Sequence, residues 1–261
     1  MLSYQHAYHA GCTADVHKHA VLAVLLARLT LKDRPLTYME SHAGRGLYDL
    51  SSVEALKTGE AAAGILRILA EGRLPLGHPY REALEAVRRR HGPHAYPGSP
   101  WIAGHILRPQ DRLHLMELHP QEHAALKATI RGPNVHVHRR DGLEGLVAIA
   151  PPVPRAGLVF IDPSYEVKTD YDAVARTAMT LHRKWPEATI LLWYPLLAAG
   201  LHTVLRETLA HAALPKWRCD EVLFAHPATV RGMHGSGLAL VNQPYGSDAD
   251  LDRVAALFAP D

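Results

Sequence analysis

Residues 35–46 read PLTYMESHAGRG, an apolar and β-favouring run that passes directly into a turn with two glycines. The run from Pro35 to Glu40 predicts a short strand, and the glycines predict a turn at its end. Glycine lacks a Cβ and tolerates positive φ, so such a turn lets the backbone approach a ligand closely. The spacing acid-x-x-x-Gly-x-Gly lacks the third glycine of the dinucleotide-binding fingerprint, which favours a ligand without phosphates.

The rest of the chain alternates helical and strand-like patterns around this stretch. Apolar residues at helical spacing predict a buried amphipathic helix over residues 14–29, with Thr13 as its N-cap. After a largely helical stretch from about residue 50, strands are predicted at residues 112–117, 135–139, 157–162, 188–193, 221–225 and 237–242. This alternation predicts an α/β fold with a doubly wound, mainly parallel sheet and right-handed crossovers.

Four of the predicted strands finish at an acidic residue, namely Glu40, Glu117, Asp141 and Asp162. In an open parallel sheet the ligand lies outside the carboxyl ends of the strands, so we expect these carboxylates to converge on one crevice. An acid in the place of Glu117 can accept hydrogen bonds from ribose hydroxyls. The set therefore favours a nucleotide-like ligand.

Glu117 follows the glycine turn at a much greater distance than the roughly 20 residues usual for a ribose-binding acid. An insertion accounts for the difference. We predict a sheet domain formed by residues 1–49 and 96–261, and an inserted helical subdomain at residues 50–95. The basic run from Arg88 to Arg90 in this subdomain fits either a phosphate-facing patch or a solvated helix face.

The segment Asp162-Pro163-Ser164-Tyr165 follows the apolar strand GLVFI and carries the most specific chemistry. An adenine N6 amine is a poor nucleophile because its lone pair is delocalised into the ring. A carboxylate from Asp162 and the carbonyl of Pro163 can accept its two N–H bonds and free that lone pair, while Tyr165 can stack on the flipped base. The alternative is an Asp-Pro turn that caps the next helix.

Composition sets the remaining bounds. The chain has 261 residues, 48% of them hydrophobic, and a formal net charge of +2, which excludes a disordered protein and leaves one large α/β domain, with or without an insertion. Its two cysteines exclude a disulfide framework. The sequence has no signal peptide pattern and no apolar run approaching the ~20 residues of a membrane span, so we predict a cytoplasmic protein.

Together these stretches resemble the bacterial 23S ribosomal RNA adenine-N6 methyltransferase family called RlmJ. The segment at Asp162 is similar to the (D/N/S)PP(Y/F) signature of amino-methyltransferases. The other matching stretches are MLSYQHAYHAG, ADVHKH, SHAGRGLYDL, TGE at Thr58 to Glu60, YPGSP, ELHP, RRDG, LWYP and RGMHGSG. They follow the order of the family along nearly the whole chain.

The resemblance implies a Rossmann-like enzyme that uses S-adenosylmethionine without a metal and acts on 23S ribosomal RNA, with no membrane or obligate protein partner. It implies cofactor contacts from His19, His42, Ser99, Glu117, Asp141, Gly142 and Asp162. Asp162 would also accept the proton. Tyr4 would contact the RNA, and His6 and Lys18 match positions near the active site. The sequence departs from the signature at Ser164, where the second proline is expected, so that a backbone N–H returns beside Pro163 and φ is less restricted.

Three other functions compete with this interpretation. The 19 histidines suggest a metal hydrolase, but HxH spacing is common in so histidine-rich a chain and no HExxH or Cys–His zinc pattern occurs. An RNA-binding module without catalysis would use the Arg88 to Arg90 run but would not need Asp162 beside Tyr165. A DNA adenine-N6 methyltransferase would share the Asp-Pro-x-Tyr chemistry, and only the resemblance along the whole chain favours RNA.

Overall fold

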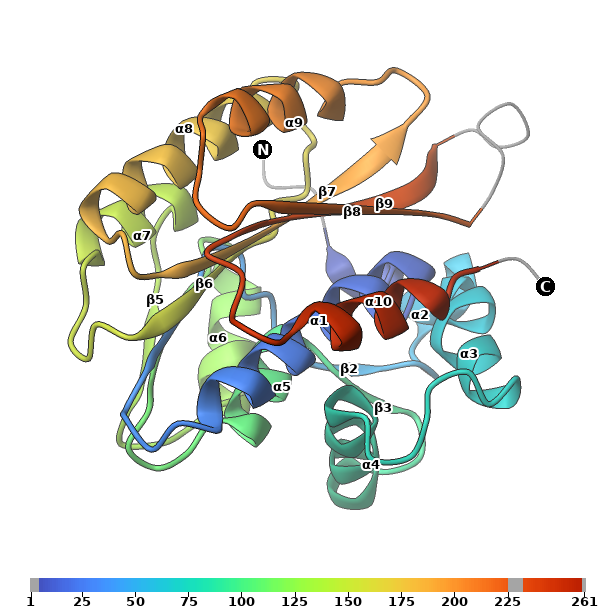
Figure 1. The fold of residues 1–261 in the computed structure, drawn as a ribbon. Helices are drawn as coiled ribbons and strands as arrows, with labels where there is room; N and C mark the ends of the chain where they lie inside the picture. Colours follow the sequence, from blue (N-terminus) through green and yellow to red (C-terminus); the bar gives the residue numbers. More distant parts are fainter. Residues whose placement is uncertain (1–4, 225–231, 260–261) are drawn as a thin grey trace.

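A computed structural model describes residues 5–224 and 232–259, and Figure 1 shows their fold. Within these residues, seven strands form one sheet in the order β5-β4-β1-β6-β7-β9-β8. The strands are β1 (Thr37–Glu40), β4 (Arg112–Met116), β5 (Val135–His138), β6 (Gly157–Ile161), β7 (Thr189–Leu197), β8 (Arg218–Leu223) and β9 (Met233–Val241). All pairs from β5 to β7 are parallel, and β9 is antiparallel to both of its neighbours. The predicted mainly parallel sheet is confirmed.

Helices cover both faces of this sheet. Figure 1 shows α7 (Gly142–Ile149), α8 (Asp170–Lys184) and α9 (His202–His211) on one face. The opposite face carries α1 (Thr13–Thr30), α5 (Ser99–Ile106) and α10 (Asp248–Ala256), while α6 (Pro120–Thr129) connects β4 to β5. No helix in the described parts of the chain has the length and apolarity needed to cross a membrane.

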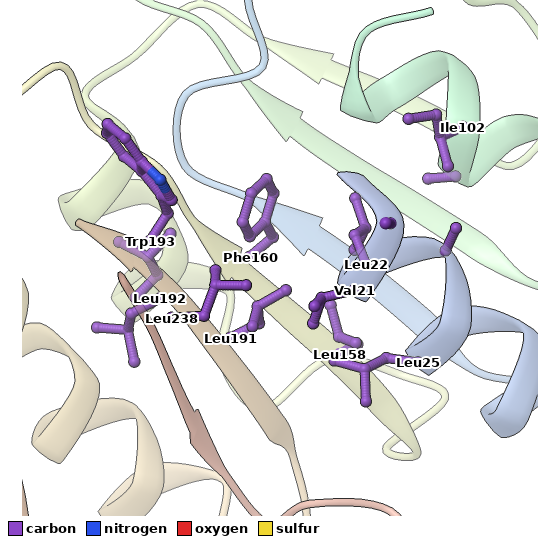
Figure 2. Packing of buried hydrophobic residues seen from close by; sticks show 14 of the residues in the cluster. Val21, Leu22, Leu25, Ile102, Leu158, Phe160, Leu191, Leu192, Trp193 and Leu238 are labelled. Carbon is purple, nitrogen blue, oxygen red and sulfur yellow. The ribbon is translucent and has the colours of Figure 1, made fainter. Parts of the chain in front are cut away.

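The helix α1 is buried from residue 13 to residue 26, because it lies against the sheet and is itself covered by α5, α10 and the stretch that follows β2. Figure 2 shows Val21 and Leu25 of α1 beside Leu158 of β6. The predicted N-cap, Thr13, is wrong. Cys12 is the N-cap, and its Sγ accepts the N–H of Asp15 at 3.4 Å. The Thr13 hydroxyl donates instead to the carbonyl of Ala63 at 3.4 Å.

The stretch predicted as an insertion is helical in the structure. It contains α2 (Val53–Thr58), the π-helical turn η2 (Ala62–Leu66), α3 (Arg67–Ala70) and α4 (Pro79–His91). Two short antiparallel strands, β2 (Leu47–Asp49) and β3 (Ala95–Pro97), stand at its two ends. Buried side chains such as Ile65, Ile68 and Tyr80 belong to the same apolar cluster as the sheet domain.

The strand order reverses between β1 and β6. From β1 the chain proceeds outward to β4 and β5, and it then returns to the other side of β1 as β6. Crossovers leave such a switch point in opposite directions, so a crevice opens at the carboxyl ends of its two strands. β1 ends at Glu40, and Asp162 directly follows β6.

Candidate active site

A pocket lies at the carboxyl ends of β1, β4 and β6. Its lining includes these residues that the sequence singled out: His6, Lys18, His19, His42, Ser99, Glu117, Asp162 and Pro163. Asp141, Gly142 and Tyr165 do not line it, and Tyr4 lies outside the described residues. Two glycines, Gly44 and Gly98, and the aromatic Trp193 add to the wall.

Asp162 is held in this pocket by two contacts. Its backbone N–H donates to the Ser41 hydroxyl at 3.2 Å, and its Oδ2 lies 2.7 Å from Nζ of Lys18. Both side chains are nearly buried, with exposed fractions of 10% and 6%. The helix-capping alternative for Asp162 is wrong, because the next helix, α8, begins at Asp170 with Thr169 as its N-cap.

Lys18 belongs to a longer chain of charges along the first turns of α1. Its Nζ also lies 3.0 Å from Oδ1 of Asp15 and 4.9 Å from the ring centre of Trp193. Oδ2 of Asp15 lies 3.0 Å from Nε2 of His6. Burial by itself raises the pKa of Asp15, but the charges of His6 and Lys18 hold that pKa well below its ordinary value.

Sequence reasoning missed Asp15, although a signal was present. An acid and a lysine three residues apart on a helix lie on the same face, and here that face is buried. Charges that are buried on one face are normally paired, so Asp15 and Lys18 were candidates for a functional pair.

Glu117 fixes the glycine turn that follows β1. Its Oε2 accepts the N–H of Gly44 at 2.8 Å, and its Oε1 accepts the N–H of His119 at 2.7 Å. Burial raises the pKa of Glu117, and these two backbone hydrogen bonds oppose that rise. Gly44 has φ +59°, and a Cβ at this position would overlap the hydroxyl of Tyr48. The turn therefore requires glycine here.

The expected convergence of four acids is only half right. Glu117 and Asp162 line the pocket, whereas Glu40 is buried behind it and accepts hydrogen bonds from the hydroxyls of Tyr38, at 2.9 Å, and Ser99. Burial raises the pKa of Glu40 to about 8. Asp141 is exposed, and its Oδ1 accepts the N–H of Glu144 in the first turn of α7.

Two histidines contribute to the pocket through different environments. His19 is buried, and its Nδ1 lies 3.0 Å from the hydroxyl of Tyr96. Burial lowers the pKa of His19 to about 3, so its imidazole is neutral at physiological pH. His42 is exposed, with its Nδ1 2.8 Å from the Ser41 hydroxyl.

Tyr165 lies in the core rather than in the pocket. Only 8% of the residue is exposed, and its hydroxyl donates to the carbonyl of Trp193 at 2.7 Å. Its ring centre lies 4.4 Å from that of Tyr171. Tyr48 lines the pocket, and so does Trp193, which stands in the LWYP stretch of β7. Sequence reasoning gave it no role in the site, because a tryptophan in an apolar strand is usually a core residue.

The residues present fit S-adenosylmethionine. Gly44 and Gly98 leave part of the wall without side chains, and a Cβ at Gly98 would come within 3.0 Å of the Tyr48 ring. Acceptor carboxylates suit ribose hydroxyls and a cationic group, and the pocket has Glu117 and Asp162. In the described parts of the chain, no group of three or more His, Cys, Asp or Glu side chains is placed to hold a metal ion.

Known proteins resemble the chain along almost its entire length. The family model described as "Ribosomal RNA large subunit methyltransferase D, RlmJ" matches residues 33–259. The ribosomal RNA large subunit methyltransferase J of Escherichia coli is 36% identical over 97% of this chain and 91% of its own length. The protein of the same name from Haemophilus influenzae is 35% identical over 97% of this chain and 92% of its own length.

Solved structures agree with this relationship. A crystal structure of a Legionella pneumophila protein is 36% identical and superposes with a TM-score of 0.85, covering 95% of this chain and 92% of that one. A spermidine synthase bound to the transition-state analogue AdoDATO superposes with a TM-score of 0.50 at 11% identity, covering 95% of this chain and 72% of that one, which shows a shared fold alone. The topology of the sheet and the family match together establish that the chain belongs to the RlmJ family of ribosomal RNA large subunit methyltransferases.

Proposed function

We propose that this S-adenosylmethionine-dependent methyltransferase methylates the N6 amine of an adenine in 23S ribosomal RNA. The observation that carries the proposal is the position of Asp162, whose carboxylate lines a pocket at the switch point of the sheet and is oriented by Lys18 at 2.7 Å. The family membership supports a ribosomal RNA substrate. An RNA substrate of this kind predicts a cytoplasmic protein.

S-adenosylmethionine, when bound, supplies an electrophilic methyl group on its sulfonium. Glu117, His19, His42 and Ser99 are proposed to hold the cofactor, since all four line the pocket. Contacts of Asp141 and Gly142 with the cofactor remain predictions. A Cβ at Gly142 would overlap the carbonyl of Ser41, so the close packing of α7 on the β1 turn is one structural reason for this glycine.

Asp162 is proposed to accept one N6–H bond of the target adenine and then the proton. Its Oδ2 faces Lys18, and no hydrogen bond from the described residues reaches Oδ1, which leaves that oxygen for the amine. The ammonium of Lys18 restrains the carboxylate in one orientation, which is how preorganised charge lowers a barrier. The carbonyl of Pro163 is proposed to accept the second N–H.

Two aromatic residues are candidates for stacking on the target base. Tyr165 stays a prediction as the stacking residue, because its ring would have to leave the contact with Tyr171 to reach the pocket. Trp193 already lines the pocket and is a second candidate for stacking. His6 and Lys18 are proposed near the substrate, and Tyr4, outside the described residues, stays a predicted RNA contact.

The inserted subdomain at residues 50–95 is proposed to carry part of the RNA-binding surface. The three arginines in the basic run of α4 differ in their exposure to solvent. Arg88 is partly buried, and burial lowers its pKa, whereas Arg89 and Arg90 are exposed. Arg89 is only loosely paired, since its Nη1 lies 3.9 Å from Oε2 of Glu85. We therefore assign the RNA-facing role to Arg89 and Arg90.

One experiment tests the proposed function directly. N6-methyladenosine is mapped in 23S RNA from cells with and without the protein, and a single adenine should lose its methyl group when the protein is absent. An unchanged map would overturn the proposal. Purified protein is then offered unmodified 23S RNA and adenine-containing duplex DNA separately. Methyl transfer to DNA alone would favour the DNA alternative, and RNA binding without transfer would favour a non-catalytic module.

A further inference from the structure

The chain just before α1 contacts the active site and also the stretch that follows β2. We call residues 58–65, which run from the end of α2 into η2, the seat segment. The hydroxyl of Thr58 donates to the carbonyl of Tyr8, and Oε1 of Glu60 lies 2.8 Å from Nδ1 of His9. The N–H of Ile65 donates to the carbonyl of Gly11 at 2.9 Å.

Gly64 brings the two backbones into direct contact. A Cβ at Gly64 would overlap the carbonyl oxygen of Gly11 and would come within 2.6 Å of the carbonyl carbon of Cys12. The backbone of Gly64 has φ −95° and ψ −114°, which interrupts the helical geometry of η2. A side chain here cannot be accommodated by a rotamer change, because the atoms it meets belong to the backbone at the start of α1.

From Gly11 the contacts lead to the catalytic carboxylate. The N–H of Gly11 donates to Oδ2 of Asp15 at 2.9 Å. The other oxygen of Asp15 lies 3.0 Å from Nζ of Lys18, which in turn lies 2.7 Å from Oδ2 of Asp162. Each of these side chains is at most 10% exposed. Because closely packed side chains have little free space around them, a displacement of Gly11 should also displace Asp15, Lys18 and Asp162.

We propose that the seat segment is a positioning element for methyl transfer, which sets the orientation of Asp162 through Gly11, Asp15 and Lys18. Its residues do not touch the pocket themselves. Glu60 and Thr58 bind residues 8 and 9, and the close backbone contact of Gly64 determines the position of residues 11 and 12. The contacts of Asp15 and Lys18 connect this position to Asp162. The inference deepens the proposed function and rests on it for its assay.

The first test replaces Gly64 by alanine. Gly64→Ala should lower the single-turnover rate of methyl transfer to 23S RNA by about 10- to 100-fold, since misplacement by about 1 Å can cost that much. Cofactor affinity should stay within about threefold, because Glu117, His42 and Ser99 lie outside α1 and only His19 of the proposed cofactor contacts belongs to it. Gly104→Ala is the matched control, as its Cβ would meet nothing within 4 Å on the exposed side of α5.

A double-mutant cycle separates positioning from general destabilisation. If the seat segment acts through Asp15, Gly64→Ala should slow an Asp15→Asn enzyme by less than about twofold, because the connection is already broken. Rate losses that multiply in the double variant would overturn the proposed route. A folded Gly64→Ala enzyme with the wild-type rate would overturn the inference itself.

The milder pair Thr58→Val and Glu60→Gln covers the case in which Gly64→Ala does not fold. Thr58→Val removes the hydroxyl donor and Glu60→Gln removes the negative charge beside His9, and neither adds volume. Together they should slow transfer several-fold at unchanged cofactor affinity. A wild-type rate for this double variant would then overturn the inference. Failure of the proposed function is distinguishable, because in that case the wild-type protein and Gly104→Ala would also leave 23S RNA unmethylated.

Discussion

Replacing Asp162 by asparagine should separate the catalytic and structural roles of the carboxylate. Asn keeps the size of the side chain and replaces an anionic acceptor by a neutral amide. Loss of one well-placed electrostatic contact typically lowers a rate by about 10²- to 10³-fold, or about 3–4 kcal/mol. We therefore expect the turnover of Asp162→Asn to fall by at least about 100-fold.

The structural cost of the same substitution should be smaller. Breaking a buried ion pair by removing one partner costs about 3–5 kcal/mol when the other charge is left alone. Lys18 keeps Asp15 at 3.0 Å, so we expect about 1–3 kcal/mol. For a chain of this size that lowers Tm by about 3–10 °C, which leaves the variant folded at assay temperature.

The assay measures single-turnover methyl transfer to unmodified 23S transcripts at saturating S-adenosylmethionine, with thermal melting of each variant in parallel. Asp172→Asn is the matched control, because Asp172 lies in α8 with 62% of its side chain exposed. Near wild-type turnover of a folded Asp162→Asn enzyme would refute the catalytic assignment, and the mechanism would lose its proton acceptor.

Three further outcomes are expected. Burial raises the pKa of Glu40 from 4.5 to about 8, so its contribution to stability is fully present below about pH 4.5 and is lost as the pH rises to about 8. Glu40→Gln should therefore flatten the fall of Tm between about pH 5 and pH 8, and an unchanged slope would contradict the buried acid. Arg89→Glu with Arg90→Glu should weaken RNA binding several-fold in filter-binding assays and leave cofactor binding intact, because like charge then faces phosphate; unaltered affinity would mean a solvated helix face. Calorimetry in EDTA should show S-adenosylmethionine binding, and no binding of either the cofactor or its demethylated product at millimolar concentration would oppose the assignment.

Much of the fold was accessible from sequence because its signals are local. The strand from Pro35 and the strand before Asp162 were predicted within a few residues of β1 and β6. Short apolar, β-favouring runs that are followed by a turn with glycine or proline are a strong signal for a strand. The expectation that acids at strand ends face one pocket held for Glu117 and Asp162 and failed for Glu40 and Asp141. The Thr13 cap failed because Thr is a favoured N-cap by type, whereas in the fold its hydroxyl bonds to Ala63 and Cys12 takes the cap position.

Tertiary structure decided which side chains work together. The sequence by itself determined the sheet and the family, because these depend on patterns within short windows. Of the four acids expected at the crevice, it placed only Glu117 and Asp162 correctly. It could not pair Lys18 with Asp162 or place Trp193 rather than Tyr165 at the pocket wall. Those outcomes depend on the direction in which each backbone leaves its strand, such as the positive φ of 54° at Tyr165, and on neighbours more than a hundred residues away, which set the local burial and charge.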